Sequence, residues 1–197
     1  MAVTSPIAFE LLTTESILQS AFKAARAFAF ESEFSTHLAI ATVDATKVAE
    51  FDCEILLCEP NDPASFAAAI KRAAPCDLLA IQDSQRPLTR TTQFHRALAE
   101  LTADIAAVRP TSVFTETLKA IKPDTSIDRT IERRSMLQIA TPEVIRFSAI
   151  DFAGTNSTWF VPLKSNTKSA TIVADPESLR VNSIAQISLV QALAQLN

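Results

Sequence analysis

The residues best placed for chemistry lie where an apolar run stops on an acid. Residues 77–82 (DLLAIQ) read as a buried strand, Asp83 follows directly, and Arg86 comes three positions later. In open α/β sheets ligands bind outside the carboxyl ends of the strands. Asp83 is therefore a candidate site residue, although acids at strand ends also simply cap turns. Arg86 could grip a phosphate with its planar guanidinium, or pair with Asp83 and hold the loop.

Composition argues against several other kinds of site. The only glycine is Gly154, so the glycine-rich phosphate loops GxGxxG and GxxxxGK are excluded. Three cysteines without CxxC spacing and two histidines argue against a zinc site. With a net charge of −4 and no basic cluster, we expect no nucleic-acid partner. The sequence has neither an apolar run of about 20 residues nor a signal-peptide pattern, so we expect a cytoplasmic protein without a membrane partner.

Strands and helices alternate along the chain and must position these residues. Alternation of this kind predicts an α/β fold with a mixed, mostly parallel sheet and helices on both faces. The length suits a single domain over residues 1–197. The expected strands are 38–43, 54–58, 77–82, 159–163 and 170–173, and the expected helices follow Thr14, begin at Pro63, begin near Thr92 and span 184–196.

The middle of the chain predicts a protruding β-hairpin arm at about residues 112–138. Segments 113–121 and 127–133 flank the turn-rich sequence KPDTS at 122–126. The hairpin offers only a thin apolar face, so we expect it to lie against another element such as a second subunit. Arg133 on this arm either binds an anion or keeps an exposed strand edge from pairing.

Several short motifs occur in the order found in one enzyme family. Residues 83–87 (DSQRP) resemble the DxxRP motif of the 2-C-methyl-D-erythritol 4-phosphate cytidylyltransferases. Four further blocks resemble motifs of the same family. Residues 6–9 (PIAF) correspond to PKQ followed by an apolar residue, and residues 115–119 (TETLK) correspond to (T/R)DT(I/M)K. Residues 130–133 (TIER) and 141–143 (TPE) correspond to TVDR and TPQ, and residues 172–179 (IVADPESL) correspond to KVTxPEDL.

This resemblance implies a Rossmann-like fold of the nucleotide-diphospho-sugar transferase type and a specific reaction. Such enzymes join CTP to methylerythritol 4-phosphate and release pyrophosphate, with Mg²⁺ and cationic side chains stabilising the developing charge. By resemblance, Asp83 is catalytic, Arg86 binds the polyol phosphate, and Ser65 contacts the nucleotide. The family's arm crosses a dimer, which implies a homodimer in which Thr117, Arg133 and Thr141 reach the partner's substrate site.

The sequence departs from the family on the nucleotide side. Only residues 1–5 stand where the family has its first strand and glycine-rich loop, and Ile7 and Ile172 replace lysines. Losing one well-placed donor typically lowers the rate by about 10²–10³. We therefore expect a homologue with weak or no catalysis, which forms a homodimer or supports an active paralogue in a heterodimer. The alternative is an active cytidylyltransferase, using Mg²⁺, with an altered nucleotide grip or a different polyol phosphate.

Overall fold

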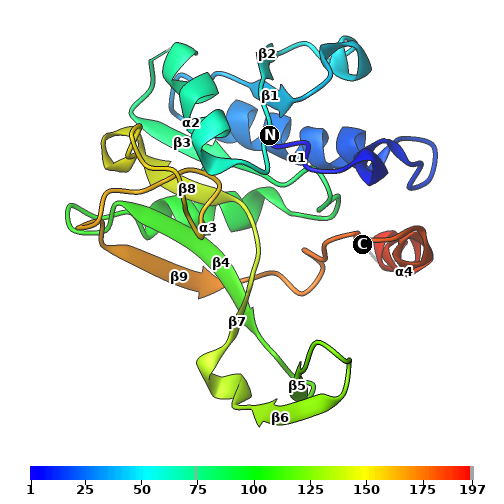
Figure 1. Cartoon of the computed structure of the whole chain (residues 1–197). Helices are drawn as coiled ribbons and strands as arrows, with labels where there is room; N and C mark the ends of the chain where they lie inside the picture. The colour runs from blue at the N-terminus through cyan, green and yellow to red at the C-terminus, as the bar shows by residue number, and fades with distance from the viewer. Residues whose placement is uncertain (74, 196–197) are drawn as a thin grey trace.

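A mixed sheet forms the centre of the protein in the computed structural model, which describes residues 1–73 and 75–195 (Figure 1). β1 pairs with β2 in parallel, while β3, β8, β4 and β7 are hydrogen-bonded in that order and β9 runs parallel to β4. β8 runs antiparallel to both β3 and β4, which makes the sheet mixed. The bounds are β1 Ala39–Thr42, β2 Glu54–Leu57, β3 Leu78–Ile81, β4 Ala107–Val113, β7 Leu137–Ile139, β8 Glu143–Arg146 and β9 Ser169–Val173.

The first three residues connect the two parts of the sheet. Ala2 forms parallel bridges to Ala41 of β1 and to Asp83, which follows β3. Its N–H donates to the carbonyl of Gln82 at 2.9 Å, and the N–H of Val3 donates to the carbonyl of Ala41 at 2.9 Å. Residues 1–3 thus occupy the place of a central strand, so the first strand is present although short.

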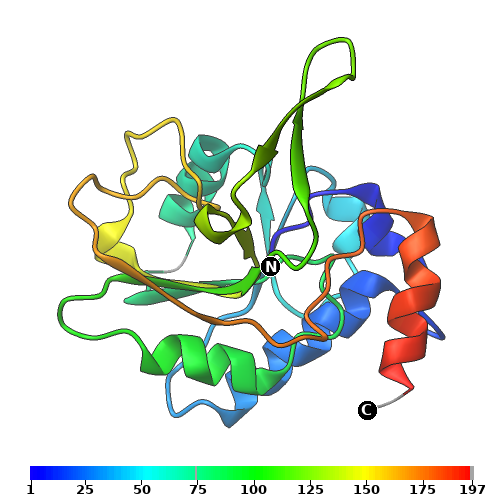
Figure 2. The ribbon, with the colours of Figure 1, turned by 90° about the horizontal axis from the view of Figure 1, so that it is seen from below.

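Helices cover both faces of the sheet, as predicted (Figure 2). Successive residues of a strand point to opposite faces. Phe66 of α2 packs in the cluster that contains Ala107, whereas Ala97 of α3 packs against Val108 on the other face. α1 lies beside α3 and contributes to a third cluster with Val3. The helices are α1 Ile17–Glu31, α2 Pro63–Arg72, α3 Thr91–Ala99 and α4 Ile184–Ala194.

Local capping explains where two of these helices begin. α2 begins at Pro63, as predicted, because the side chain of Asp62 accepts a hydrogen bond from the N–H of Ala64 at 3.0 Å. α1 begins two residues later than the predicted cap at Thr14 would place it. Its cap is Ser16, whose hydroxyl accepts from the N–H of Gln19 while the Gln19 side chain accepts from the Ser16 N–H. This reciprocal capping box satisfies two backbone donors.

The predicted arm is present and projects away from the body (Figures 1 and 2). Its hairpin consists of β5 (Leu118–Ile121) and the antiparallel β6 (Ile127–Ile131). Its stem is formed by the end of β4 and by β7, in which Thr111 pairs with Ile139. At the tip Thr125 has a φ of 65°. Ile121 and Ile127 are each 65% exposed, so the arm leaves apolar side chains in solvent.

Residues 159–163 were predicted to form a strand and do not. The hydroxyl of Ser157 accepts from the N–H of Trp159 at 2.9 Å and donates to the carbonyl of Val161 at 2.8 Å, which folds the segment into a local turn. Only one isolated bridge, between Ile150 and Leu163, remains. In the last predicted helix, α4 ends at Ala194, and Leu196 lies outside the described residues. Within the described ranges, no helix is long and apolar enough to span a membrane.

Candidate functional site

Asp83 lies just beyond β3, next to the central segment 1–3, but its carboxylate is not open to solvent. The residue is only 4% exposed. One oxygen, Oδ1, accepts from the N–H of Gln85 at 3.0 Å, and the other, Oδ2, accepts from Nε of Arg180 at 2.6 Å. The sequence placed Asp83 correctly at a strand end. It did not indicate that both oxygens would have partners within the chain.

Arg180 precedes α4 and brings together segments distant in sequence. Besides Asp83, its guanidinium donates from Nη2 to Oε1 of Gln85 at 2.5 Å and to Oγ1 of Thr4 at 3.1 Å, and from Nη1 to Oδ1 of Asn182. The side chain of Arg180 is 33% exposed, against 6% for that of Asp83. The guanidinium therefore shields the carboxylate from solvent. We call the group formed by Thr4, Asp83, Gln85, Arg86 and Arg180 the Asp83 corner.

Thr141 adjoins the Asp83 corner in the same chain. Its hydroxyl accepts from the N–H of Asp83 at 3.1 Å and donates to Oε1 of Gln82 at 3.1 Å, and the residue is 3% exposed. The peptide bond from Thr141 to Pro142 is cis. Within its own chain, the Thr141 hydroxyl is therefore buried against β3 beside Asp83.

Arg86 neither pairs with Asp83 nor points into solvent. The residue is 7% exposed, and its guanidinium donates to the carbonyl of Ser178 at 2.5 Å and to that of Ile139 at 2.6 Å. Among the described residues, no acceptor lies within hydrogen-bond distance of its buried Nε. Burial lowers the pKa of Arg86, and Arg180 acts in the same direction while Asp83 opposes it. Arg86 therefore ties the arm stem to the segment before α4.

Ser65 lies at the same edge of the sheet but outside the Asp83 corner. It stands in the first turn of α2, where its hydroxyl accepts from the N–H of Glu59 at 3.1 Å. The loop before α2 reaches the corner through Asn61, whose side-chain amide donates to the carbonyl of Thr4 at 2.9 Å. Ser65 thus shapes the loop that approaches the corner, and Asn61 makes the direct connection.

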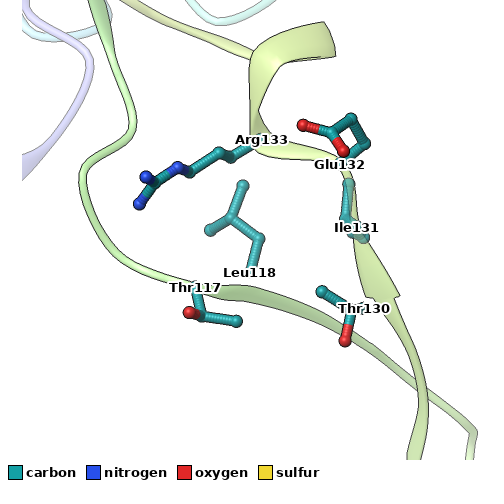
Figure 3. A pocket seen from close by; sticks show the side chains of 6 residues that line it. All are labelled: Thr117, Leu118, Thr130, Ile131, Glu132 and Arg133. Atoms are coloured by element: carbon teal, nitrogen blue, oxygen red, sulfur yellow. The ribbon is translucent and has the colours of Figure 1, made fainter.

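Thr117 and Arg133 lie together on the arm, away from Asp83 of the same chain. They line an open hollow between β5 and β6, with Leu118, Thr130, Ile131 and Glu132 (Figure 3). The guanidinium of Arg133 donates to the carbonyl of Thr115, so it holds the start of the arm. The structure therefore brings two predicted residues to one hollow on the arm and leaves both exposed.

A buried ion pair joins β4 and β8, and its acid, Glu143, follows Thr141 by two residues. Nη1 of Arg109 is 3.3 Å from Oε1 of Glu143, and its guanidinium stacks 3.6 Å from the ring centre of Trp159. Oε2 of Glu143 accepts from the N–H of Phe160 at 2.8 Å. Burial raises the pKa of Glu143 to about 7, although Phe160 and Arg109 both oppose the increase. These contacts hold the irregular segment 157–163 against the sheet.

The residues at the Asp83 corner do not suit Mg²⁺. This ion is bound through carboxylate oxygens and keeps a strict octahedral shell. Here the two oxygens of Asp83 accept from Gln85 and Arg180, and a guanidinium stands where the ion would approach. Within residues 1–73 and 75–195, no cluster of three or more Asp, Glu, His or Cys side chains could hold a metal.

The fold is that of cytidylyltransferases. The 2-C-methyl-D-erythritol 4-phosphate cytidylyltransferase from Thermus thermophilus matches with a TM-score of 0.72 and 16% identity, covering 98% of this chain and 97% of that chain. The 4-diphosphocytidyl-2C-methyl-D-erythritol synthase from Anaerococcus prevotii matches with a TM-score of 0.70 and 15% identity, covering 98% and 94%. A comparison with curated protein sequences gave no match.

The sequence identifies the family. Residues 61–173 match the model of 2-C-methyl-D-erythritol 4-phosphate cytidylyltransferase (IspD), and the chain belongs to this family. The matched region runs from the loop before α2 to the end of β9 and includes Asp83, Arg86 and the arm. The resemblance inferred from short motifs is thereby confirmed.

Three residues of the corner, Thr4, Gln85 and Arg180, were missed by sequence reasoning. Thr4 and Arg180 both lie outside the matched region. Arg180 is 97 positions from Asp83, and no spacing rule links them. The available signal was indirect: a single arginine in the otherwise uncharged stretch 178–197, directly after the PESL motif.

Proposed function

We propose that this chain is a single-domain, cytoplasmic homologue of the methylerythritol phosphate cytidylyltransferases that does not transfer a cytidylyl group. The observation that carries the proposal is the pairing of Asp83 with Arg180 at 2.6 Å, in a position where Asp83 is 4% exposed. An acid that must contact a substrate or a metal cannot do so while a guanidinium covers it. The arm and the polyol-phosphate corner are retained without an open catalytic acid.

The connection after the first strand supports the same proposal. Only Thr4 and Ser5 separate the strand position at 1–3 from the 3-10 turn Pro6–Phe9. This connection contains no glycine. Phosphoryl transfer depends almost wholly on positioning and charge stabilisation. Without the loop and with Ile7 and Ile172 in place of lysines, the chain lacks the groups that would hold a triphosphate.

The arm gives the protein its remaining role in this proposal, as a subunit of a dimer. Thr117 and Arg133 line an open hollow on the arm, and Ile121 and Ile127 are exposed there. We propose that the arm docks on a second copy or on an active paralogue and lends these residues to it. Size-exclusion chromatography with light scattering should give a dimer alone or a mixed dimer with the paralogue. A monomer under both conditions contradicts this part of the proposal.

The catalytic part is tested by pyrophosphate release from CTP, methylerythritol 4-phosphate and Mg²⁺. We expect no release above the protein-free reaction. Release that disappears in Asp83→Ala would refute the proposal and favour the second candidate, an active cytidylyltransferase with an altered nucleotide grip. One observation favours that candidate: Arg180 supplies a partly exposed cation at the strand ends, where the family uses lysines.

A further inference from the structure

β9 is an edge strand of the central sheet (Figure 1). Among the described residues it pairs with β4 alone, in parallel and in an unbroken register over residues 169–173. An edge strand presents backbone groups with which another strand can pair, and natural proteins protect such edges with charged side chains, above all lysine, or with proline. Residues 169–174 (SATIVA) contain neither, and Ile172 stands where the motif KVTxPEDL has its lysine.

The backbone groups of alternate residues of β9 point away from β4. The N–H of Ala174 donates to the carbonyl of Thr111 in β4, so residue 174 faces inward. The direction of the backbone groups alternates along a strand, so three residues point outward: Ser169, Thr171 and Val173. The carbonyl of Val173 accepts from Nη1 of Arg96 at 3.2 Å and keeps a second lone pair. The edge can therefore accept a further strand.

The side chains beside this edge are uncharged on both faces of the sheet. On the face covered by α3, Ala170 and Ile172 are only partly buried against the cluster that contains Ala97. On the other face Val173 is 75% exposed, and Thr171 is also exposed. A second strand at this edge would remove apolar surface from water on both faces, which favours association.

The charges at the two ends of β9 favour a second copy in antiparallel orientation. Lys168 precedes the strand, with a side chain that is 71% exposed and 4.0 Å from Asp104. Asp175 follows the strand and pairs with Arg96. A two-fold axis at Thr171 brings the basic start of each strand to the acidic end of the other, whereas a parallel arrangement would place the two lysines side by side. Like charges directly opposite each other destabilise a sheet.

We propose that β9 pairs with β9 of a second copy of this chain, antiparallel about Thr171, and extends the sheet across two molecules. The two Thr171 residues lie opposite each other, so the N–H of each donates to the carbonyl of the other. Ser169 pairs with Val173 of the second copy in the same way. Ala170 packs beside Ile172 of the second copy. This surface is separate from the arm.

The contact is weak by itself and adds to any dimer that the arm forms. A two-stranded pairing is only marginally stable in water, so we expect a dissociation constant of about 1 mM for the edge alone. The edge therefore does not hold two chains together at micromolar concentration. Two chains joined by their arms carry two edges and associate more tightly through them. That second step rests on the proposed function, whereas the edge pairing does not.

The experiment is amide hydrogen exchange followed by NMR on the full chain, at concentrations from about 0.05 to 2 mM. The N–H groups of Ala170 and Ile172 face β4 and should be protected at every concentration. Those of Ser169, Thr171 and Val173 should exchange fast in dilute solution and at least about twofold more slowly at the highest concentration.

Two variants and a control test the pairing. Thr171→Pro removes an outward N–H and keeps the bonds to β4, so it should weaken association by about tenfold or more. Thr171→Lys sets two like charges opposite each other and should act in the same direction. Thr155→Lys places the same charge on an exposed loop and should behave like the wild type. Near-UV circular dichroism checks the fold, and Thr171→Lys decides if Thr171→Pro does not fold.

Each outcome decides the inference. Slower exchange at residues 169, 171 and 173 with rising concentration, lost in the Thr171 variants, supports it. The inference is overturned if exchange at these residues does not depend on concentration, as expected for an edge that takes a peptide of another protein, or if the Thr171 variants behave like the wild type. An arm dimer with unchanged exchange overturns only this inference, whereas concentration-dependent protection without an arm dimer overturns only the dimer part of the proposed function.

Discussion

Glu143→Gln should make the protein more stable than the wild type at pH 8 and about 1 kcal/mol less stable at pH 4, where only the loss of one hydrogen bond counts. Glu143 is 2% exposed and accepts from Arg109 and from the N–H of Phe160. A glutamine at this position removes the buried negative charge and keeps one acceptor, while its amide nitrogen replaces the other oxygen and leaves one of the two donors without a partner. It is also the residue of the family's TPQ motif, so the backbone should accommodate it.

The magnitude follows from the pKa of the carboxyl group. Burial raises this pKa from 4.5 to about 7, so the native protein keeps a proton that the unfolded chain releases between these values. Where the native state binds more protons, stability falls as the pH rises. The wild type should therefore lose about 3 kcal/mol of unfolding free energy relative to Glu143→Gln across this window. The loss is complete above about pH 7 and absent below about pH 4.5.

Urea unfolding of both proteins from pH 4 to pH 8 measures this difference. Glu116→Gln, an exposed acid on the arm, is the matched control and should follow the wild type throughout. The reasoning is refuted if Glu143→Gln is less stable than the wild type at pH 8. That result would mean that the ion pair with Arg109 more than compensates for the burial of the carboxylate.

Three further predictions concern packing, the corner and the arm. Gly154→Ala should lower the free energy of unfolding, measured in urea, by about 1–3 kcal/mol, because the Cβ of the new alanine would lie 2.7 Å from Cβ of Pro162. Thr141→Val should lower the free energy of unfolding by about 1–3 kcal/mol, because it leaves the buried N–H of Asp83 without its acceptor. An unchanged midpoint of urea unfolding would contradict this prediction. Replacing residues 115–135 by a short Gly-Ser linker should hardly change the melting temperature and should abolish any dimer seen by light scattering. A large drop in melting temperature would contradict the view that the body folds independently of the arm.

Local sequence signals were sufficient for most elements of the fold. Asp62 and Pro63 fix the start of α2, and the apolar run before Asp83 is β3. The arm could be predicted because its turn residues lie close together in sequence. β8 was not predicted, because its four residues include Glu143 and Arg146 and its partners β3 and β4 are distant in sequence.

The candidate site was predicted less completely, for a physical reason. Asp83 and Arg86 belong to one motif, so sequence could place them at one corner. Their partners are set by tertiary contacts: Asp83 meets Arg180, and Arg86 meets the carbonyls of Ser178 and Ile139. Motifs specify which residues lie near a site, but not which of them are already paired within it.

The account is tested most directly by titrating the wild-type protein with CTP, in Mg²⁺ and in EDTA, by calorimetry. If Arg180 covers Asp83 as described, Mg²⁺ should neither create nor strengthen binding of CTP, with or without methylerythritol 4-phosphate. Binding of CTP that requires Mg²⁺ and is lost in Asp83→Ala would contradict the account, because it would show that the carboxylate is free to hold a metal-bound nucleotide.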